Sequence, residues 1–164
     1  MKSSLKKVFF EGKWRGRGLV IEKGLTYAEE LTFIVLRTEP AIVVNAQQFT
    51  KHEETGAPLH AENGFVKILP VGGDTEKKVE ANFSHPFGLN EFSYGTFNGE
   101  KLVLEASDAG CFQRGKSAKG KQTTFFRREY WVNESGNLCY KMFLGVDGAA
   151  PFEHLNGELM PVTD

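Results

Sequence analysis

The sequence predicts an all-β protein, a single antiparallel up-and-down barrel of ten strands. Two observations lead to this class. Strand-sized segments recur every 10 to 15 residues, separated by Gly, Pro, Asn or Asp, and no segment of ten or more residues holds a helical period. The 18 glycines and 14 phenylalanines supply the turns and aromatic strand residues that such a fold needs.

Ten strands are expected, and closing them into a barrel removes the exposed sheet edges. An interior of that size can hold one small ligand. The predicted strands cover residues 13–21, 26–37, 41–50, 58–69, 77–85, 89–98, 101–107, 122–132, 137–144 and 153–161.

The turns and the alternation of apolar residues support these strands. Asn98-Gly99 and Ser135-Gly136-Asn137 lie between alternating segments and allow the positive φ of tight hairpins. Alternation places one set of side chains inside the barrel. The clearest inward runs are Val79, Ala81 and Phe83, Leu102 and Leu104, and Leu138, Tyr140, Met142 and Leu144.

Composition limits the classes of function. The 164 residues fit one domain, 1–164, and a net charge of −1 provides no electrostatic basis for binding nucleic acid. No apolar run is long enough to span a membrane, and no secretory signal is evident. Cys111 and Cys139 are interpreted as reduced thiols, so a cytoplasmic protein is expected. Lys2 to Phe10 is expected to form a turn or two of helix over one barrel end.

Familiar catalytic motifs are missing from the sequence. It contains no Gly-x-Ser-x-Gly elbow, no HExxH and no P-loop. Residues 109–122 carry Arg114, Lys116, Lys119 and Lys121 around two glycines, a pattern that could attract an anion but is more typical of a solvated flexible loop.

Three of the four histidines precede residue 100. His52 lies among charged residues before Gly56 and is expected on a surface loop. His60 begins a strand, where either face is open to it. His85 continues the inward face of Val79, Ala81 and Phe83, although inward histidines are more often hydrogen-bonded core residues than ligands.

The fourth histidine, His154, follows the turn-forming segment 148–151. Alternation groups His154 with Asn156 and Glu158, opposite Leu155 and Leu159, and so favours the outer surface. An irregular chain after Pro151 or a bulge at Gly157 would turn it inward.

Five segments, in order from residue 12 to about 160, resemble those of the nitrobindins, haem-binding β-barrels related in architecture to lipocalins and fatty-acid-binding proteins. Gly12 to Gly18 (GKWRGRG) resembles the opening GxWxGxG, and Tyr27 to Phe33 (YAEELTF) resembles YxEELTF. The others are Pro58 to Phe65 against MHxExGYF, Gly88-Leu89 with Gly95-Thr96-Phe97 against GL…GTY, and Pro151 to Leu155 against P-x-x-HL.

The resemblance implies a ferric b-type haem in one open end of the barrel. The matching axial iron ligand is His154, so the resemblance requires the last strand to depart from simple alternation. His60 matches the distal-side histidine, and His85 and Leu144 match pocket-lining positions. Related barrels are associated with binding nitric oxide and with isomerising peroxynitrite to nitrate, which makes this chain a candidate peroxynitrite isomerase.

The sequence departs from the family pattern at three places. The segment between Gly18 and Tyr27 is about four residues shorter and lacks a YPTI-like stretch, and the loop around 109–121 is longer. His85 stands where the family has a polar amide. It could hydrogen-bond a distal ligand, or ligate the iron and close its open position.

Two functions are therefore compared. The first is a haem-binding barrel that takes nitric oxide or peroxynitrite, with His154 on the iron and no nucleic-acid or membrane partner. The second is a haem-free, lipocalin-like carrier of a small apolar ligand, with His154 exposed. Reconstitution with hemin distinguishes them.

Overall fold

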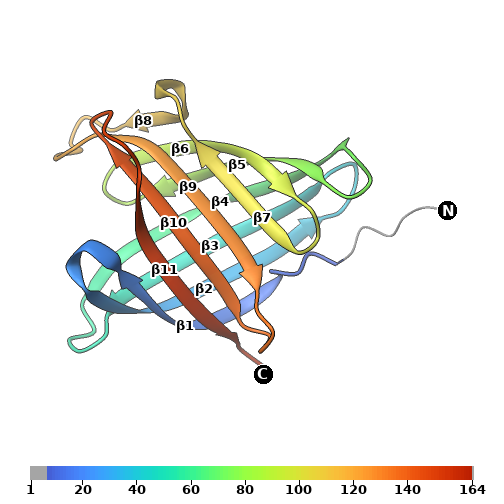
Figure 1. Ribbon diagram of the computed structural model, residues 1–164, viewed down its shortest axis with the longest axis horizontal. Coiled ribbons are helices and arrows are strands. Elements are labelled where there is room, and N and C mark those ends of the chain that lie inside the picture. Colours follow the sequence, from blue (N-terminus) through green and yellow to red (C-terminus); the bar gives the residue numbers. More distant parts are fainter. Residues whose placement is uncertain (1–6, 164) are drawn as a thin grey trace.

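The computed structural model describes residues 7–163, and eleven antiparallel strands dominate this part of the chain (Figure 1). The strands are β1 Gly12–Val20, β2 Leu25–Arg37, β3 Ile42–His52, β4 Pro58–Gly72, β5 Lys77–His85, β6 Leu89–Phe97, β7 Lys101–Ala106, β8 Phe112–Arg114, β9 Thr123–Val132, β10 Leu138–Val146 and β11 Phe152–Pro161.

Ten of these strands close into a barrel. Each pairs with its neighbour along the chain from β1 to β7 and from β9 to β11, β7 pairs with β9, and β11 returns to β1. The predicted ten-stranded antiparallel barrel is therefore confirmed, and its predicted strands match the observed ones closely. Closure leaves every barrel strand with a hydrogen-bonded neighbour on both sides, which satisfies the backbone without an exposed edge.

The strand β8 was not predicted. It lies within the segment that was interpreted as a flexible loop, and it pairs with Leu89–Glu91 at the beginning of β6. A 3-10 turn, Ala109–Cys111, precedes it, with the Asp108 carboxylate accepting a hydrogen bond from the Gly110 backbone. The only other helix in residues 7–163 is a 3-10 turn at Ile21–Lys23. None of the described helices is long and apolar enough to cross a membrane.

Two glycines make room for a buried tyrosine pair. Gly18 on β1 faces Gly157 on β11. A Cβ atom at Gly18 would meet the Tyr27 ring at 2.2 Å, and one at Gly157 would meet the Tyr140 ring at 2.5 Å. The two tyrosine hydroxyls are hydrogen-bonded to each other inside the barrel. The last glycine of the GxWxGxG pattern is thus required by close packing.

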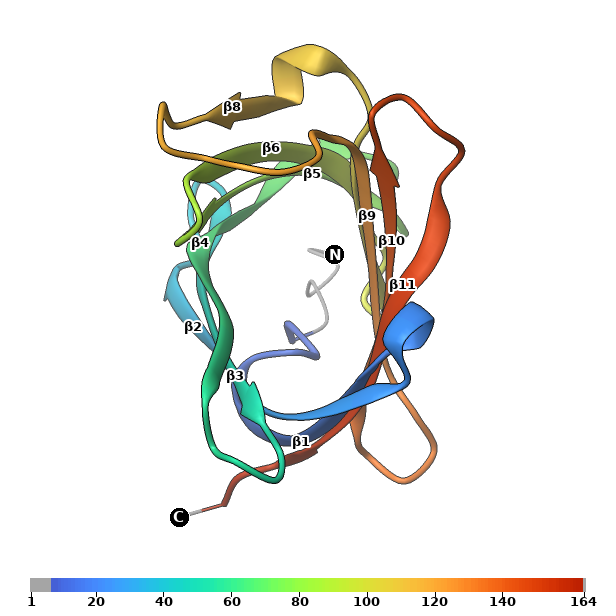
Figure 2. The same ribbon diagram turned by 90° about the vertical axis from the view of Figure 1, so that its left-hand side faces the viewer.

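Residues 7–11, which precede β1, lie across one end of the barrel (Figure 2). Phe10 is fully buried there and packs edge-on against Phe33 and Phe97. The Trp14 indole donates a hydrogen bond to the Phe10 carbonyl at 2.9 Å. Of the predicted helix Lys2 to Phe10, residues 2–6 lie outside the described residues, and residues 7–10 form no helix, with a single turn from Val8 to Glu11.

Candidate functional site

The opposite end of the barrel contains a cavity of about 340 Å³. This volume is within the range of small-molecule and cofactor sites. Apolar side chains form most of its wall, and they are Val20, Leu25, Leu59, Phe87, Leu89, Phe112, Phe126, Met142, Leu144 and Leu155. The polar residues of the wall include His154 on β11 and, on the opposite side of the barrel, His60 and His85 on β4 and β5; Lys23, Gln48, Thr50, Glu62, Glu91 and Thr123 also line the cavity.

A β-bulge turns His154 into this cavity. Leu155 pairs with Met142 and Glu153 pairs with Phe143, so His154 is the extra residue of β11 and has no partner on β10. Because of this bulge, His154 and its neighbour Leu155 both line the cavity, which strict alternation forbids. The pairing of Gly157 with Tyr140 is regular, so the irregularity lies at His154 and not at Gly157.

The 3-10 turn between β1 and β2 holds the His154 ring in place. The Glu22 carboxylate, on this turn, is hydrogen-bonded to Nδ1 of His154. A carboxylate can only accept, so Nδ1 carries the proton and Nε2 of the neutral ring keeps its lone pair. A histidine held by a carboxylate in this way is the usual arrangement of a metal ligand. The shortened segment between Gly18 and Tyr27 therefore supplies the partner of His154.

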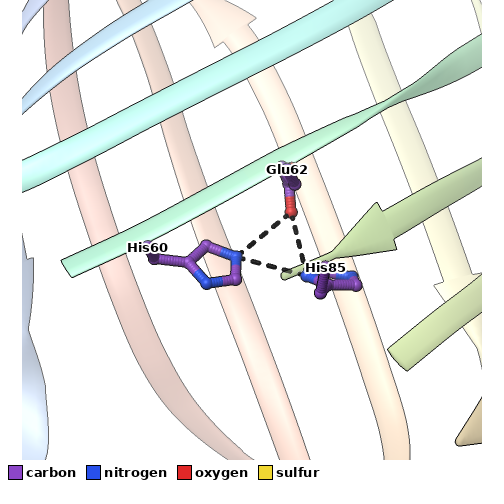
Figure 3. A group of neighbouring side chains, drawn as sticks. All are labelled: His60, Glu62 and His85. Atoms are coloured by element: carbon purple, nitrogen blue, oxygen red, sulfur yellow. Dashed lines mark hydrogen bonds and ion pairs between the residues drawn. The ribbon is translucent and has the colours of Figure 1, made fainter. Parts of the chain in front are cut away.

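On the opposing side, His60 and His85 form a pair. Nε2 of His60 lies 3.2 Å from Nδ1 of His85 (Figure 3). Nε2 of His85 lies 2.7 Å from the Glu91 carboxylate. The His85 side chain is only 6% exposed, whereas His60 is 35% exposed at the mouth of the cavity. Both ring nitrogens of His85 are thus engaged with protein groups.

A buried ionic network lies next to this histidine pair. Arg128 lies on β9, is fully buried, and pairs with both Glu62 and Glu91. Its guanidinium also lies 3.9 Å from the centre of the Phe83 ring, a cation–π contact. With neutral histidines, two carboxylates and one guanidinium leave this part of the wall with a net negative charge.

Burial by itself would raise the pKa of both Glu62 and Glu91. The positive charge of Arg128, with the His60 ring close to Glu62 and a hydrogen bond from His85 to Glu91, outweighs burial and lowers both pKa values. Burial likewise opposes the charge on Arg128, but the two carboxylates raise its pKa well above the usual value. All three groups are charged at neutral pH.

The structure brings four of the sequence-predicted residues together. His60, His85, Leu144 and His154 all line the one cavity. His52 lies apart, at the turn after β3, where its Nδ1 accepts hydrogen bonds from the backbone amides of residues 54 and 55.

Sequence reasoning missed Glu22, Glu62, Glu91 and Arg128. Alternation carried a signal for three of these residues. Glu62 lies two residues after His60, Glu91 two after Leu89, and Arg128 two before Tyr130, so each charged residue is on an inward face. Glu22 had no such signal because it lies on a turn.

The fold and the site together define a class: an antiparallel barrel closed at one end, with an apolar cavity and a carboxylate-held histidine at the other. The model of the THAP4-like, heme-binding beta-barrel domain matches residues 5–160, and the chain belongs to this nitrobindin-like family.

Relatives of known name agree with this family. A peroxynitrite isomerase of Frankia casuarinae is 31% identical over 170 residues, covering 99% of this chain and 87% of that protein. A peroxynitrite isomerase of Frankia alni is 31% identical over 147 residues, covering 87% of this chain and 95% of the other. Among solved structures, Rv2717c from M. tuberculosis superposes with a TM-score of 0.73 at 27% identity, covering 94% of each chain.

The residues of the cavity suit a haem. An apolar wall accommodates a porphyrin, and His154 presents an unprotonated Nε2 to the cavity while its Nδ1 is held by Glu22. His60 and His85 provide polar groups on the same cavity wall. A histidine held like His154 is chemically suited to ligate a haem iron.

Proposed function

We propose that this chain binds ferric b-type haem in the cavity through His154 and that the loaded protein converts peroxynitrite to nitrate. The observation that carries the proposal is the bulge that places His154 in an apolar cavity with Nε2 free. The names of the relatives support the reaction. The iron would supply an open coordination position with Lewis-acid character.

The protein's own residues would contribute three things. Glu22 fixes the tautomer and orientation of His154. The apolar wall, with Phe87 and Leu144 among its members, excludes water around a bound ligand. His60, half-exposed at the mouth, offers a hydrogen-bonding nitrogen to an incoming anion or to nitric oxide.

His85 is assigned to positioning rather than to iron ligation. Its Nε2 is committed to Glu91 and its Nδ1 to His60. Ligating an iron through Nε2 would break the hydrogen bond to Glu91 and leave this buried carboxylate without its histidine partner, at a cost of about 1–3 kcal/mol. We therefore expect an iron that has one protein ligand and an open sixth position.

The free cysteines Cys111 and Cys139 suit a reducing compartment, and we propose a cytoplasmic location on that basis.

Reconstitution of the full chain with hemin tests the haem site. We expect a Soret band for the wild-type chain and its loss in His154→Ala, with His52→Ala as the matched control that retains the band. A wild-type chain without a Soret band, or a His154→Ala variant with the wild-type spectrum, contradicts the proposal. Such a result would leave the haem-free carrier of an apolar ligand as the function to test.

Replacing the partner of the axial histidine has a smaller expected effect. Glu22→Gln keeps the shape of the side chain but removes the carboxylate charge behind His154, and we expect haem affinity to fall about 10- to 100-fold. Competition with apomyoglobin for haem measures this change. An unchanged affinity would show that Glu22 does not support the ligand.

The reaction is tested separately by rapid mixing with peroxynitrite. We expect the haem-loaded chain to accelerate peroxynitrite decay and to raise the yield of nitrate over nitrite, compared with the haem-free chain at equal concentration. Haem binding without this acceleration would retain the cofactor assignment and reject the isomerase.

A further inference from the structure

We propose that His60, Glu62 and His85 form a second metal site, for a divalent transition ion such as Zn²⁺, on the cavity wall. This site is separate from His154 and does not rest on the binding of haem. The three side chains come from two neighbouring strands: His60 and Glu62 are on β4, and His85 is at the end of β5 (Figure 3).

Three ligand atoms converge in this group. Nε2 of His60 and Nδ1 of His85 are 3.2 Å apart, and each lies close to Oε2 of Glu62, at 3.7 and 3.6 Å respectively. A point equidistant from the three atoms is about 2.0 Å from each. Zinc bonds to histidine nitrogen and carboxylate oxygen are about 2.0–2.2 Å long, so the spacing of the three atoms matches that of zinc ligands.

The protonation pattern favours a cation at this point. Glu91 accepts a hydrogen bond from Nε2 of His85, which leaves Nδ1 of the neutral ring with its lone pair directed at His60. Glu62 contributes a carboxylate oxygen to the same point. Nε2 of His60, Nδ1 of His85 and Oε2 of Glu62 can each donate a lone pair to a metal ion. At most one proton, on Nε2 of His60, lies among these three atoms. A metal ion would replace that proton.

The surrounding groups resemble the supports of a metal site. A carboxylate behind a ligating histidine fixes its ring and raises its basicity, and Glu91 has this place behind His85. Ser93 and Arg128 in turn hold Glu91. Arg128 also pairs with Glu62, yet it balances only one of the two buried carboxylate charges.

The composition of the site selects the ion. Two imidazoles and one carboxylate are a known ligand set for zinc and for other borderline divalent ions, and they leave at least one position for water or a small anion. His60 is 35% exposed, so an ion can reach the site from the mouth of the cavity.

Zinc retention by the full chain tests the site. After removal of metal by a chelator and dialysis against Zn²⁺, we expect one Zn²⁺ per wild-type chain by elemental mass spectrometry. His60→Ala should lose it, and since His60 is half-exposed and is not one of the ion-pair partners of Arg128, this variant is expected to fold. His85→Ala should lose it too, and Glu91→Gln should bind about 10- to 100-fold more weakly.

Two matched histidine variants locate the bound ion. His52→Ala and His154→Ala are both expected to retain one Zn²⁺ per chain. A wild-type chain that retains no Zn²⁺ overturns the proposal. So does a His60→Ala or His85→Ala variant that retains as much Zn²⁺ as the wild type. Loss in His154→Ala would assign the ion to the axial histidine and would also overturn it.

Co²⁺ provides a second measurement that does not depend on variants. In the haem-free wild-type chain, Co²⁺ at this site should produce the intense visible bands of a tetrahedral ion, and added Zn²⁺ should remove them. Weak bands of a hydrated ion would contradict the proposal. The Soret band reports the haem site independently, so zinc retention without haem, or haem without zinc, shows which proposal has failed.

Discussion

Inward-facing side chains have opposite roles at the two ends of the barrel. At the closed end, Phe10, Phe33 and Phe97 fill the interior with edge-on aromatic contacts. At the open end, inward positions carry His60 and Glu62 on the wall of a cavity, and Arg128 is buried behind Glu62. Packing of apolar groups stabilises the first region, whereas the second keeps charges buried at a cost that partners must offset. The fold thus tolerates a polar site because its other end is well packed.

The largest expected effect on stability is at the closed end. Phe10→Ala removes a fully buried ring from the aromatic cluster, and we expect the free energy of unfolding to fall by about 3–5 kcal/mol. Urea unfolding followed by tryptophan fluorescence measures it. Because the cavity lies at the other end, the folded variant should still produce a Soret band with hemin. Loss of that band in the folded variant would show that the two ends are coupled.

A buried acid between the two regions has the next largest effect. Glu29 is buried, and burial raises its pKa from 4.5 to about 7 against the polar contacts of Tyr140 and Gln48. The folded chain therefore binds this proton more tightly than the unfolded chain. The stabilisation is fully present below about pH 4.5 and is lost as the pH rises through 7, on the order of 3 kcal/mol in all.

Glu29→Gln removes this titration. The variant should gain stability relative to the wild type as the pH rises from 4.5 to 8, and denaturant unfolding of both proteins at each pH measures the difference. A stability difference that does not change with pH would show that Glu29 is ionised in the folded chain throughout this range.

Two leucines on β10 allow the most direct comparison, and the second of them has the smallest expected effect. Leu138 is fully buried in the core, whereas Leu144 is half-buried and lines the cavity. We expect Leu138→Ala to cost about 2–5 kcal/mol and Leu144→Ala less than about 1 kcal/mol, because the second change only enlarges an existing space. Equal losses in urea unfolding would mean that the open end is packed as tightly as the core.

Much of the candidate site follows from patterns that the sequence displays. Alternation with Val79 and Phe83 predicts the inward His85, and the P-x-x-HL resemblance indicates His154. Alternation was wrong for His154, because it assumes an unbroken register. One extra residue in β11 turns the His154 side chain from the outer surface to the cavity. The stability of that bulge depends on contacts with β10 and with the turn that carries Glu22.

By itself, the sequence determined the class of the fold, the spans of the ten barrel strands and, for most strand residues, whether the side chain faces inward or outward. These properties are local: they depend on period-two alternation and on turn residues such as Asn98-Gly99. Only the tertiary structure decided the bulge at His154, the strand β8, the pairing of Arg128 with Glu62 and Glu91, and the convergence of three ligand atoms near His85. Each of these depends on contacts between different strands, and those contacts form only when the barrel is assembled.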